Sequence, residues 1–297
     1  MRKQQPLTHA VIYDKFCYPI ADFYTLITIG IRVLFKEGWR AFLLKVVNQF
    51  KSQNLSGKQP IYLPSASAND IQPRELGDVI NLCDLKPDES ILDVGCGTGR
   101  MAVALTGYLN ERGTYHGFDI AKAGIDRCNH NIAANYPNFH FQWVEIYNKA
   151  YNPSGTIKAR EFRFPYGDDS FDFVFLASIF THMLPDDINS YLGEINRVLK
   201  SGGRCLITFF LLNKESSELI KRGGSTLNFR YERANYSFEN WQTRESAIAY
   251  TEEYILGLYK SKLLNIKTPI YYGSWCGRQN PLTYQDIIIA EKVFNKE

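Results

Sequence analysis

The chain has 297 residues, of which 45% are hydrophobic and 22% charged, proportions that are ordinary for a globular protein and exclude wholesale disorder. A net charge of only +3 gives no basis for a nucleic-acid-binding protein. This length accommodates one large domain, or one domain with an appended segment.

The first 60 residues differ from the rest in charge, with nine Lys and Arg against three Asp and Glu. Residues 16–35 form a hydrophobic run of nearly membrane-spanning length, but a proline, an aspartate and an arginine interrupt it. Residues 39–51 repeat apolar side chains at helical spacing. We expect a helical, basic and aromatic-rich segment over residues 1–60. It either packs on a protein surface or lies on an anionic membrane through residues 16–51.

The remainder, residues 71–297, alternates strands with helices. Strands are predicted over 90–94, 114–119, 139–145, 171–177, 203–210, 265–270 and 285–291, and helices over 74–85, 100–110, 121–134, 185–199 and 251–261. This alternation predicts an α/β domain, a mostly parallel sheet with helices on both faces. Insertions at 146–161 and 213–250 are too long for plain connections, and we expect them to cap a site.

Three glycines at alternate positions follow the first predicted strand, in the stretch Ile91–Arg100. Apolar residues lead into these glycines and a helix-forming segment follows them, which is typical of a strand, a tight turn and a helix start. A glycine there lets a ligand lie against the backbone. The stretch therefore predicts a nucleotide-like ligand at the carboxyl edge of the sheet.

Two acids narrow the choice of ligand. Asp119 ends the second predicted strand, 20 residues beyond Gly99, where an acid accepts the ribose hydroxyls of an adenosine. Asp93 stands two residues before Gly95, where it would repel a dinucleotide pyrophosphate and suit a cationic amine. The glycine spacing is also GxGxG, whereas a dinucleotide prefers GxGxxG.

With these features, Ile91–Arg100 resembles the first motif of class I S-adenosylmethionine-dependent methyltransferases. Asp119 matches the ribose-binding acid of that family, residues 170–175 match its fourth strand, and residues 197–203 match the turn into its fifth. The resemblance implies a Rossmann-like three-layer sandwich with a seven-stranded sheet in the order 3-2-1-4-5-7-6, the last strand antiparallel. It also implies S-adenosylmethionine as the cofactor.

The resemblance also assigns the cofactor-binding residues. The glycine backbone would hold the amino-acid end, Asp93 the amino group and Asp119 the ribose, and Glu145 would stand near the adenine. The full set is Asp93, Gly95, Cys96, Gly97, Gly99, Asp119, Ile120, Glu145 and Ala177. No metal is expected, because the six cysteines lie far apart without a CxxC or Cys/His cluster. The same cysteine pattern favours a reducing cytoplasm.

His182 follows the fourth predicted strand, at the edge where ligands bind in open α/β folds. An oxygen nucleophile needs a general base, and His182 is the candidate for that role. The alternative is a histidine that hydrogen-bonds its own loop or contacts the cofactor.

The acceptor side is expected from aromatic and cationic side chains in the cap and in the loop 271–282, namely Arg230, Tyr231, Tyr250, Trp275 and Arg278. The leading hypothesis is a cytoplasmic enzyme that methylates an oxygen of a small molecule or a glycan. An NAD-dependent oxidoreductase and a non-catalytic cofactor-binding or assembly protein stay open. The sequence indicates neither the acceptor nor the oligomeric state.

Overall fold

The computed structural model describes residues 79–279 and 281–293. The basic segment 1–60, including residues 16–51, lies outside the described residues, as does the start of the helix predicted over 74–85. Residues 79–83 are helical. Within the described ranges, no helix is both long and apolar enough to span a bilayer.

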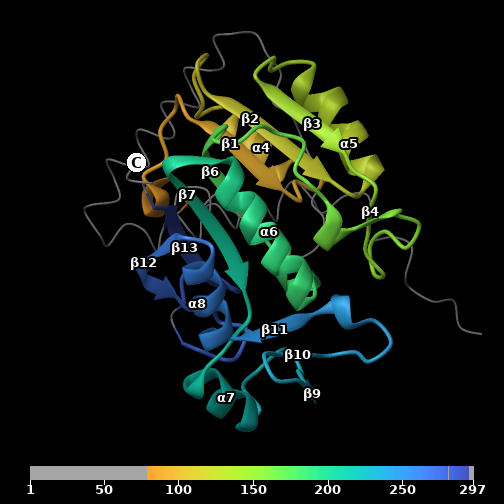
Figure 1. Ribbon diagram of the computed structural model, residues 1–297, viewed down its shortest axis with the longest axis vertical. Helices are drawn as coiled ribbons and strands as arrows, with labels where there is room; N and C mark the ends of the chain where they lie inside the picture. The colour runs from red at the N-terminus through yellow and green to blue at the C-terminus, as the bar shows by residue number, and fades with distance from the viewer. Residues whose placement is uncertain (1–78, 280, 294–297) are drawn as a thin grey trace, which may run out of the picture. The chain divides into compact units, whose positions relative to one another are not determined.

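Seven strands form the main sheet, in the order β12-β13-β7-β6-β1-β2-β3 (Figure 1). Their bounds are Ser90–Val94 (β1), Thr114–Asp119 (β2), Phe139–Trp143 (β3), Phe171–Leu176 (β6), Leu199–Phe209 (β7), Leu264–Tyr271 (β12) and Asp286–Lys292 (β13). The pairings are parallel except those of β13, which runs antiparallel to β7 and to β12. Counted along the chain, the order is 3-2-1-4-5-7-6, which confirms the predicted topology.

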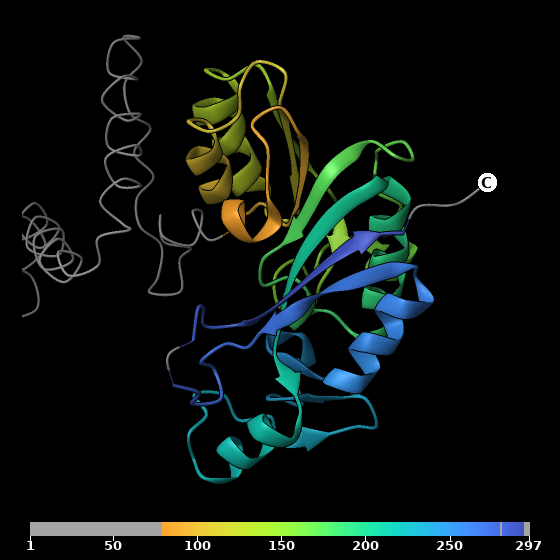
Figure 2. The same ribbon diagram turned by 90° about the vertical axis from the view of Figure 1, so that its left-hand side faces the viewer.

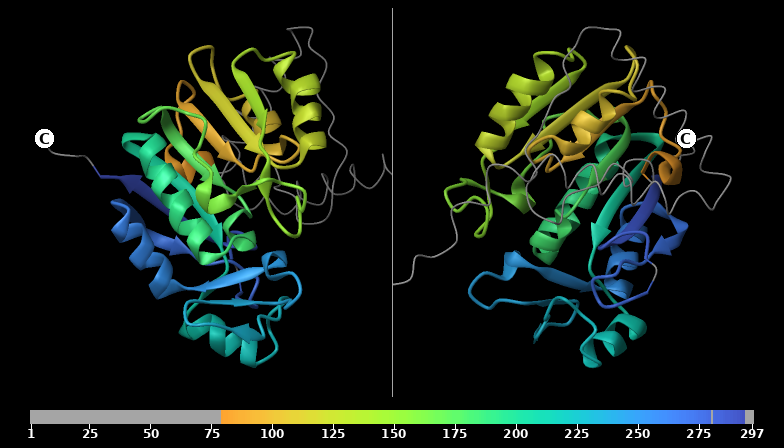
Figure 3. Two further views of the ribbon diagram at one scale, coloured as in Figure 1. Left: turned by 45° about the vertical axis from the view of Figure 1, so that its right-hand side comes forward. Right: turned by 180° about the vertical axis from the view of Figure 1, so that it is seen from behind.

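Helices cover both faces of this sheet (Figure 3). They are α4 (Arg100–Leu105), α5 (Lys122–Cys128, continued by a π-helical turn Asn129–Ala133), α6 (Pro185–Val198) and α8 (Glu252–Ser261). Side chains of β6 alternate between the two faces, as strand geometry requires. Phe173 and Phe175 belong to the core with α4 and α5, whereas Val174 and Leu176 belong to the core with α6 and α8. Burial of these apolar faces fixes the three layers.

Some predicted boundaries are wrong by several residues. The helix predicted over 100–110 ends at Leu105, because the chain turns and Asn110 N–H donates to the carbonyl of Pro87 before β1. The strand predicted over 203–210 begins at Leu199. Gly202 and Gly203 lie within this strand, where its pairing with β6 shifts register, and not in a turn before it.

The two insertions form small sheets of their own. Residues 146–161 contain the parallel pair β4 (Ile146–Tyr147) and β5 (Ile157–Lys158) and the 3₁₀ turn η2 (Ala159–Glu161). The cap contains a second sheet in the order β8-β11-β10-β9, and it lies beyond the carboxyl end of β7 (Figures 1 and 2). Its elements are β8 (Leu211–Leu212), α7 (Lys214–Lys221), β9 (Tyr231–Glu232), β10 (Tyr236–Phe238), the turn η4 (Arg244–Ser246) and β11 (Ile248–Thr251).

Candidate active site

The glycine turn is fastened to the end of β2. The amides of Gly95 and Cys96 both donate to the carbonyl of Phe118, at 2.9 and 3.1 Å. Gly95 and Gly97 have φ angles of +84° and +55°, in the left-handed region that disfavours other residues. A side chain at Gly95 would collide with Ile179, whereas one at Gly97 would meet nothing within 4 Å in the described part of the chain. The backbone at Gly97 is therefore open to a ligand.

Asp119 supports this turn from the neighbouring strand. One carboxylate oxygen accepts from the Gly97 amide at 2.8 Å, and the other accepts from the Ala121 amide at 2.7 Å. Burial raises the pKa of Asp119. Each carboxylate oxygen can accept more than one hydrogen bond, so the group keeps capacity for ligand hydroxyls.

Asp93 lies beneath the turn rather than at its surface. Its side chain is 3% exposed and accepts a hydrogen bond from the Tyr115 hydroxyl. Burial raises its pKa to about 8, with the Tyr115 hydrogen bond acting in the opposite direction. The acid is therefore mostly protonated at neutral pH. The sequence placed it at the amino group of the cofactor, but its direct partner in the structure is Tyr115.

Three further predicted cofactor residues, Cys96, Ile120 and Glu145, make other contacts in the structure. The Cys96 side chain is buried, and a hydrogen bond with Cys128, together with burial, raises the pKa of its thiol. The carbonyl of Ile120 accepts from the Trp143 indole at 3.1 Å. Glu145 is exposed just after β3, and its carbonyl accepts the amides of Thr156 and Ile157, where the first insertion returns to the sheet.

The loop after β6 is held in an unusual conformation. Ser178, which follows Ala177, has a φ angle of +59°, which is strained for a residue with a side chain. Its amide donates to the Thr208 hydroxyl at 2.8 Å, and its own hydroxyl donates to Gln285 at 3.0 Å. The Thr208 hydroxyl also donates to Gln285, at 2.6 Å. These contacts fix the loop that carries Ile179 onto the glycine turn. Sequence reasoning missed Thr208 and Gln285, although both lie where strands meet the carboxyl edge.

His182 ends the 3₁₀ turn η3 (Phe180–His182), which packs against η4 and β11. Its Nδ1 lies 2.9 Å from the carbonyl of Glu245. Because a carbonyl only accepts, Nδ1 carries the hydrogen, and in the neutral ring Nε2 presents a lone pair. Burial lowers the pKa of His182 below its usual 6.5. Nε2 faces the hydroxyl of Tyr151, a residue of the first insertion, at 3.5 Å.

Thr181, next to His182, is 1% exposed, and its hydroxyl has no hydrogen-bond partner within the described ranges. An unpaired buried hydroxyl costs about 1–3 kcal/mol. Elsewhere in the described residues, no three His, Cys, Asp or Glu side chains gather as a metal site.

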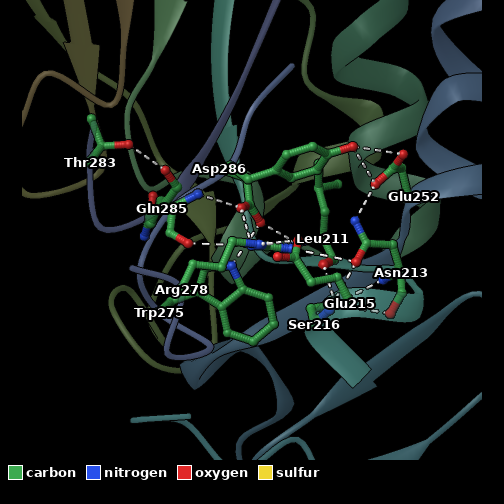
Figure 4. A network of polar contacts seen from close by, with 12 residues as sticks. Leu211, Asn213, Glu215, Ser216, Glu252, Trp275, Arg278, Thr283, Gln285 and Asp286 are labelled. Atoms are coloured by element: carbon green, nitrogen blue, oxygen red, sulfur yellow. Dashed lines mark hydrogen bonds and ion pairs between the residues drawn. The ribbon is translucent and has the colours of Figure 1, made fainter. Parts of the chain in front are cut away.

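Two of the predicted acceptor residues, Trp275 and Arg278, belong to a structural network instead (Figure 4). Asp286 is fully buried and accepts from the indole of Trp275 at 2.7 Å, from Arg278 at 3.1 Å and from two backbone amides. Burial raises the pKa of Asp286 to about 6. Arg278 also pairs with Glu215 of α7, at 2.8 Å. The network fastens the cap to the edge of β13.

Tyr250 is likewise fully buried, and its hydroxyl donates to the carbonyl of Met183. Tyr231 and Arg230 remain on the cap surface. Tyr231 is half-buried and stacks on Phe238 with ring centroids 5.3 Å apart. The Arg230 guanidinium is exposed, 6.0 Å from the ring of Tyr231. Of the five predicted acceptor residues, these two keep surface for a ligand.

Comparison with known proteins agrees with this geometry. A family model for methyltransferase domains matches residues 85–247. Demethylmenaquinone methyltransferase of Bacillus mycoides is 26% identical over 154 residues, 52% of this chain and 57% of that protein. The O-methyltransferase cnsE of Penicillium expansum is 31% identical over 121 residues, 40% of this chain and 37% of that protein. A 2-phytyl-1,4-naphtoquinone methyltransferase of Trichormus variabilis is 27% identical over 125 residues, 42% of this chain and 48% of that protein. The chain thus spans about half the length of these relatives.

Solved structures share the fold. A SAM-dependent methyltransferase from Methanosarcina mazei superposes with a TM-score of 0.51 at 20% identity, covering 76% of this chain and 100% of that one. A protein from Pyrococcus horikoshii gives a TM-score of 0.52 at 16% identity, covering 87% of this chain and 99% of that one.

The sheet order and the glycine turn define the fold of class I methyltransferases, as the sequence resemblance implied. The chain belongs to the methyltransferase-domain family. S-adenosylmethionine is therefore the expected cofactor. The family match, rather than the glycine spacing alone, decides against the NAD-dependent alternative.

Gly97→Ala tests the open backbone of the turn, with Gly223→Ala as its matched control. Both glycines have positive φ and open space around a Cβ, at +55° and +76°. Each substitution should cost about 1–2 kcal/mol of stability. Only Gly97→Ala should weaken S-adenosylmethionine binding in calorimetry, by about tenfold or more. Equal affinities in the two variants would contradict a ligand lying on Gly97.

Asp93→Asn should reveal the neutral buried acid. The pKa of Asp93 is about 8 in the folded protein, above its ordinary 3.8, so between these pH values the folded state holds a proton on Asp93 that the unfolded state has lost. The resulting stability is present at acid pH and is lost as pH rises through about 8. Asparagine stays neutral and still accepts the Tyr115 hydrogen bond. Its melting temperature should match the wild type near pH 4 and exceed it at pH 8.5, with a difference that grows as pH rises between these values. A melting temperature below that of the wild type at pH 8.5 would contradict the raised pKa, because it would mean that the folded protein stabilises the Asp93 carboxylate.

Proposed function

We propose that this chain transfers a methyl group from S-adenosylmethionine to a hydroxyl oxygen of a small molecule. The observation that carries the proposal is the geometry of His182. A neutral imidazole with a fixed tautomer presents a bare Nε2 at the carboxyl edge, beyond the loop that packs on the glycine turn. An oxygen nucleophile needs such a base.

The cofactor site fits a cationic nucleoside. The open backbone at Gly97 would accept the amino-acid end, with Gly99 and the neighbouring turn beneath it. Asp119 would take the ribose hydroxyls, and exposed Glu145 would lie near the adenine. Asp93 is positioned to place negative charge under the turn once a cation binds, because the cation would favour its ionised form.

When bound, S-adenosylmethionine supplies a methyl group on a positively charged sulfur, and the carbon–sulfur bond breaks as the acceptor oxygen takes the methyl. His182 Nε2 accepts the proton of the acceptor hydroxyl. The carbonyl of Glu245 holds Nδ1–H and so stabilises the imidazolium that forms. Alignment of the oxygen with the methyl group supplies much of the rate, and the cap and the first insertion provide it.

The acceptor we favour is a small ring-containing molecule, and a glycan is the second candidate. Two relatives are named as quinone-related methyltransferases and one as an O-methyltransferase. Residues 16–51, outside the described range, remain a proposed contact with the cytoplasmic face of a membrane. Equal flotation on vesicles of the full chain and of a chain lacking residues 1–55 would contradict that contact.

Methyl-labelled S-adenosylmethionine incubated with the full chain and a metabolite extract tests the proposed function. Transfer of label to a small molecule, identified by mass spectrometry, is the expected result. Cofactor binding without transfer to any fraction would favour the non-catalytic alternative.

His182→Ala should lower kcat with the acceptor so identified by about 10²–10⁴-fold. In the wild type, kcat/KM should rise with pH through a value below 6.5 and be level above 7, because burial lowers the pKa of His182 and the neutral ring is the base. The control is His130→Ala, an exposed histidine on the π-helical turn after α5, which should behave as wild type. Near-normal turnover of His182→Ala would exclude the base role.

A further inference from the structure

We propose that the Tyr151 phenol occupies the acceptor position beside His182 in the free chain, and that the acceptor is a planar hydroxy-aromatic molecule that displaces it. This inference rests on the proposed function and deepens it by naming the acceptor class. Tyr151 is one of the two residues that bracket the imidazole, with Glu245 on the other side.

The contact between Tyr151 and His182 is the one that a phenolic substrate would make. The Tyr151 hydroxyl lies 3.5 Å from Nε2, the nitrogen that carries the lone pair. The two rings meet edge to face, with centroids 4.9 Å apart and planes inclined by 71°. The side chain thus presents both a hydroxyl and a ring edge to the base.

The first insertion is built to bring Tyr151 to this place. The side-chain amide of Asn148 donates to the carbonyl of His182 at 3.1 Å, which ties the insertion to the backbone of the histidine. The Asn148 side-chain oxygen accepts from the amides of Ala150 and Tyr151, at 2.9 and 3.0 Å, which shapes the turn. Asn148 and Tyr151 are three residues apart. The Tyr151 side chain can therefore move away from His182 while Asn148 keeps its hydrogen bond to the His182 carbonyl.

Tyr151 is also held loosely enough to be displaced. Its side chain is 58% exposed, and its described ring and hydroxyl contacts are with His182. A separation of 3.5 Å is at the long limit of hydrogen bonds. Displacing it therefore loses one long hydrogen bond and one ring contact with His182, which an incoming hydroxy-aromatic molecule restores.

The cap also presents an exposed aromatic side chain close to the turn η4. Trp241 is 51% exposed, and the guanidinium groups of Arg233 and Arg244 lie 5.2 and 5.0 Å from its ring centroid. Arg244 belongs to η4, the turn whose Glu245 carbonyl accepts from His182. The aromatic ring of an acceptor can stack on the exposed Trp241 side chain. A phenol also loses its proton near pH 10, as tyrosine does, which a histidine can assist more readily than it can a sugar hydroxyl.

Binding of p-cresol, which has the structure of the tyrosine side chain, tests the proposal without any methyl transfer. The full chain is labelled with ¹³C at histidine Cε1, and the His182 signal is assigned with His182→Gln. Tyr151→Ala should bind p-cresol about tenfold more tightly than wild type, because removing an occupant raises the competent fraction. Toluene and cyclohexanol, which lack the hydroxyl or the aromatic ring, should leave the signal in place.

Tyr147→Ala is the matched control, because Tyr147 is also exposed, at 41%, and belongs to the same insertion. It should bind p-cresol as wild type does. Equal p-cresol affinity in wild type and Tyr151→Ala, or an equal response to cyclohexanol, would overturn the proposal. Thermal unfolding confirms that each variant is folded. Because the readout is binding, p-cresol binding without methyl transfer would leave this inference standing while the proposed function failed.

Discussion

The carboxylate of Asp119 is the interaction on which the site depends. It accepts the Gly97 amide from the turn after β1 and the Ala121 amide from the start of the next helix. Parallel pairing of β1 with β2 brings both strand ends to one edge, and the carbonyl of Phe118 then holds the amides of Gly95 and Cys96. The open backbone at Gly97 therefore follows from strand register, not from the glycines alone.

Asp93 lies beneath that turn, where the proposed function places the cationic end of the cofactor. The free protein lowers the energetic cost of burying this acid by keeping it protonated. Asp93 lies in the interior with Tyr115 as its hydrogen-bond donor, and burial raises its pKa. A buried carboxylate would be costly without a partner charge. In the proposed function, the cationic cofactor would supply such a charge on binding, so a group that costs stability in the free protein would favour the ligand.

The sheet order was predicted from the resemblance to class I methyltransferases, and the structure confirms it. The sequence itself was sufficient for the alternation of strands and helices and for the glycine turn, because these follow from local periodicity and from a motif of ten residues. It was insufficient for the cap. Trp275 and Arg278 were chosen by residue type, and their use depends on Asp286, which also binds the amide of Leu211, 75 residues earlier. An aspartate opening the apolar strand β13 was the available signal. Tyr151 could not be found, because nothing local shows which loop reaches His182.

In the proposed mechanism, His182 gives the two insertions a part in the chemistry as well as in acceptor recognition. Its tautomer is fixed by a carbonyl of the cap turn η4, and its backbone is bound by Asn148 of the first insertion. Movement of η4 would remove the acceptor for Nδ1–H and with it the preference for a bare Nε2. In the proposed mechanism, the elements that surround the acceptor therefore also determine which nitrogen of His182 faces it, so acceptor choice and base strength are set by the same contacts.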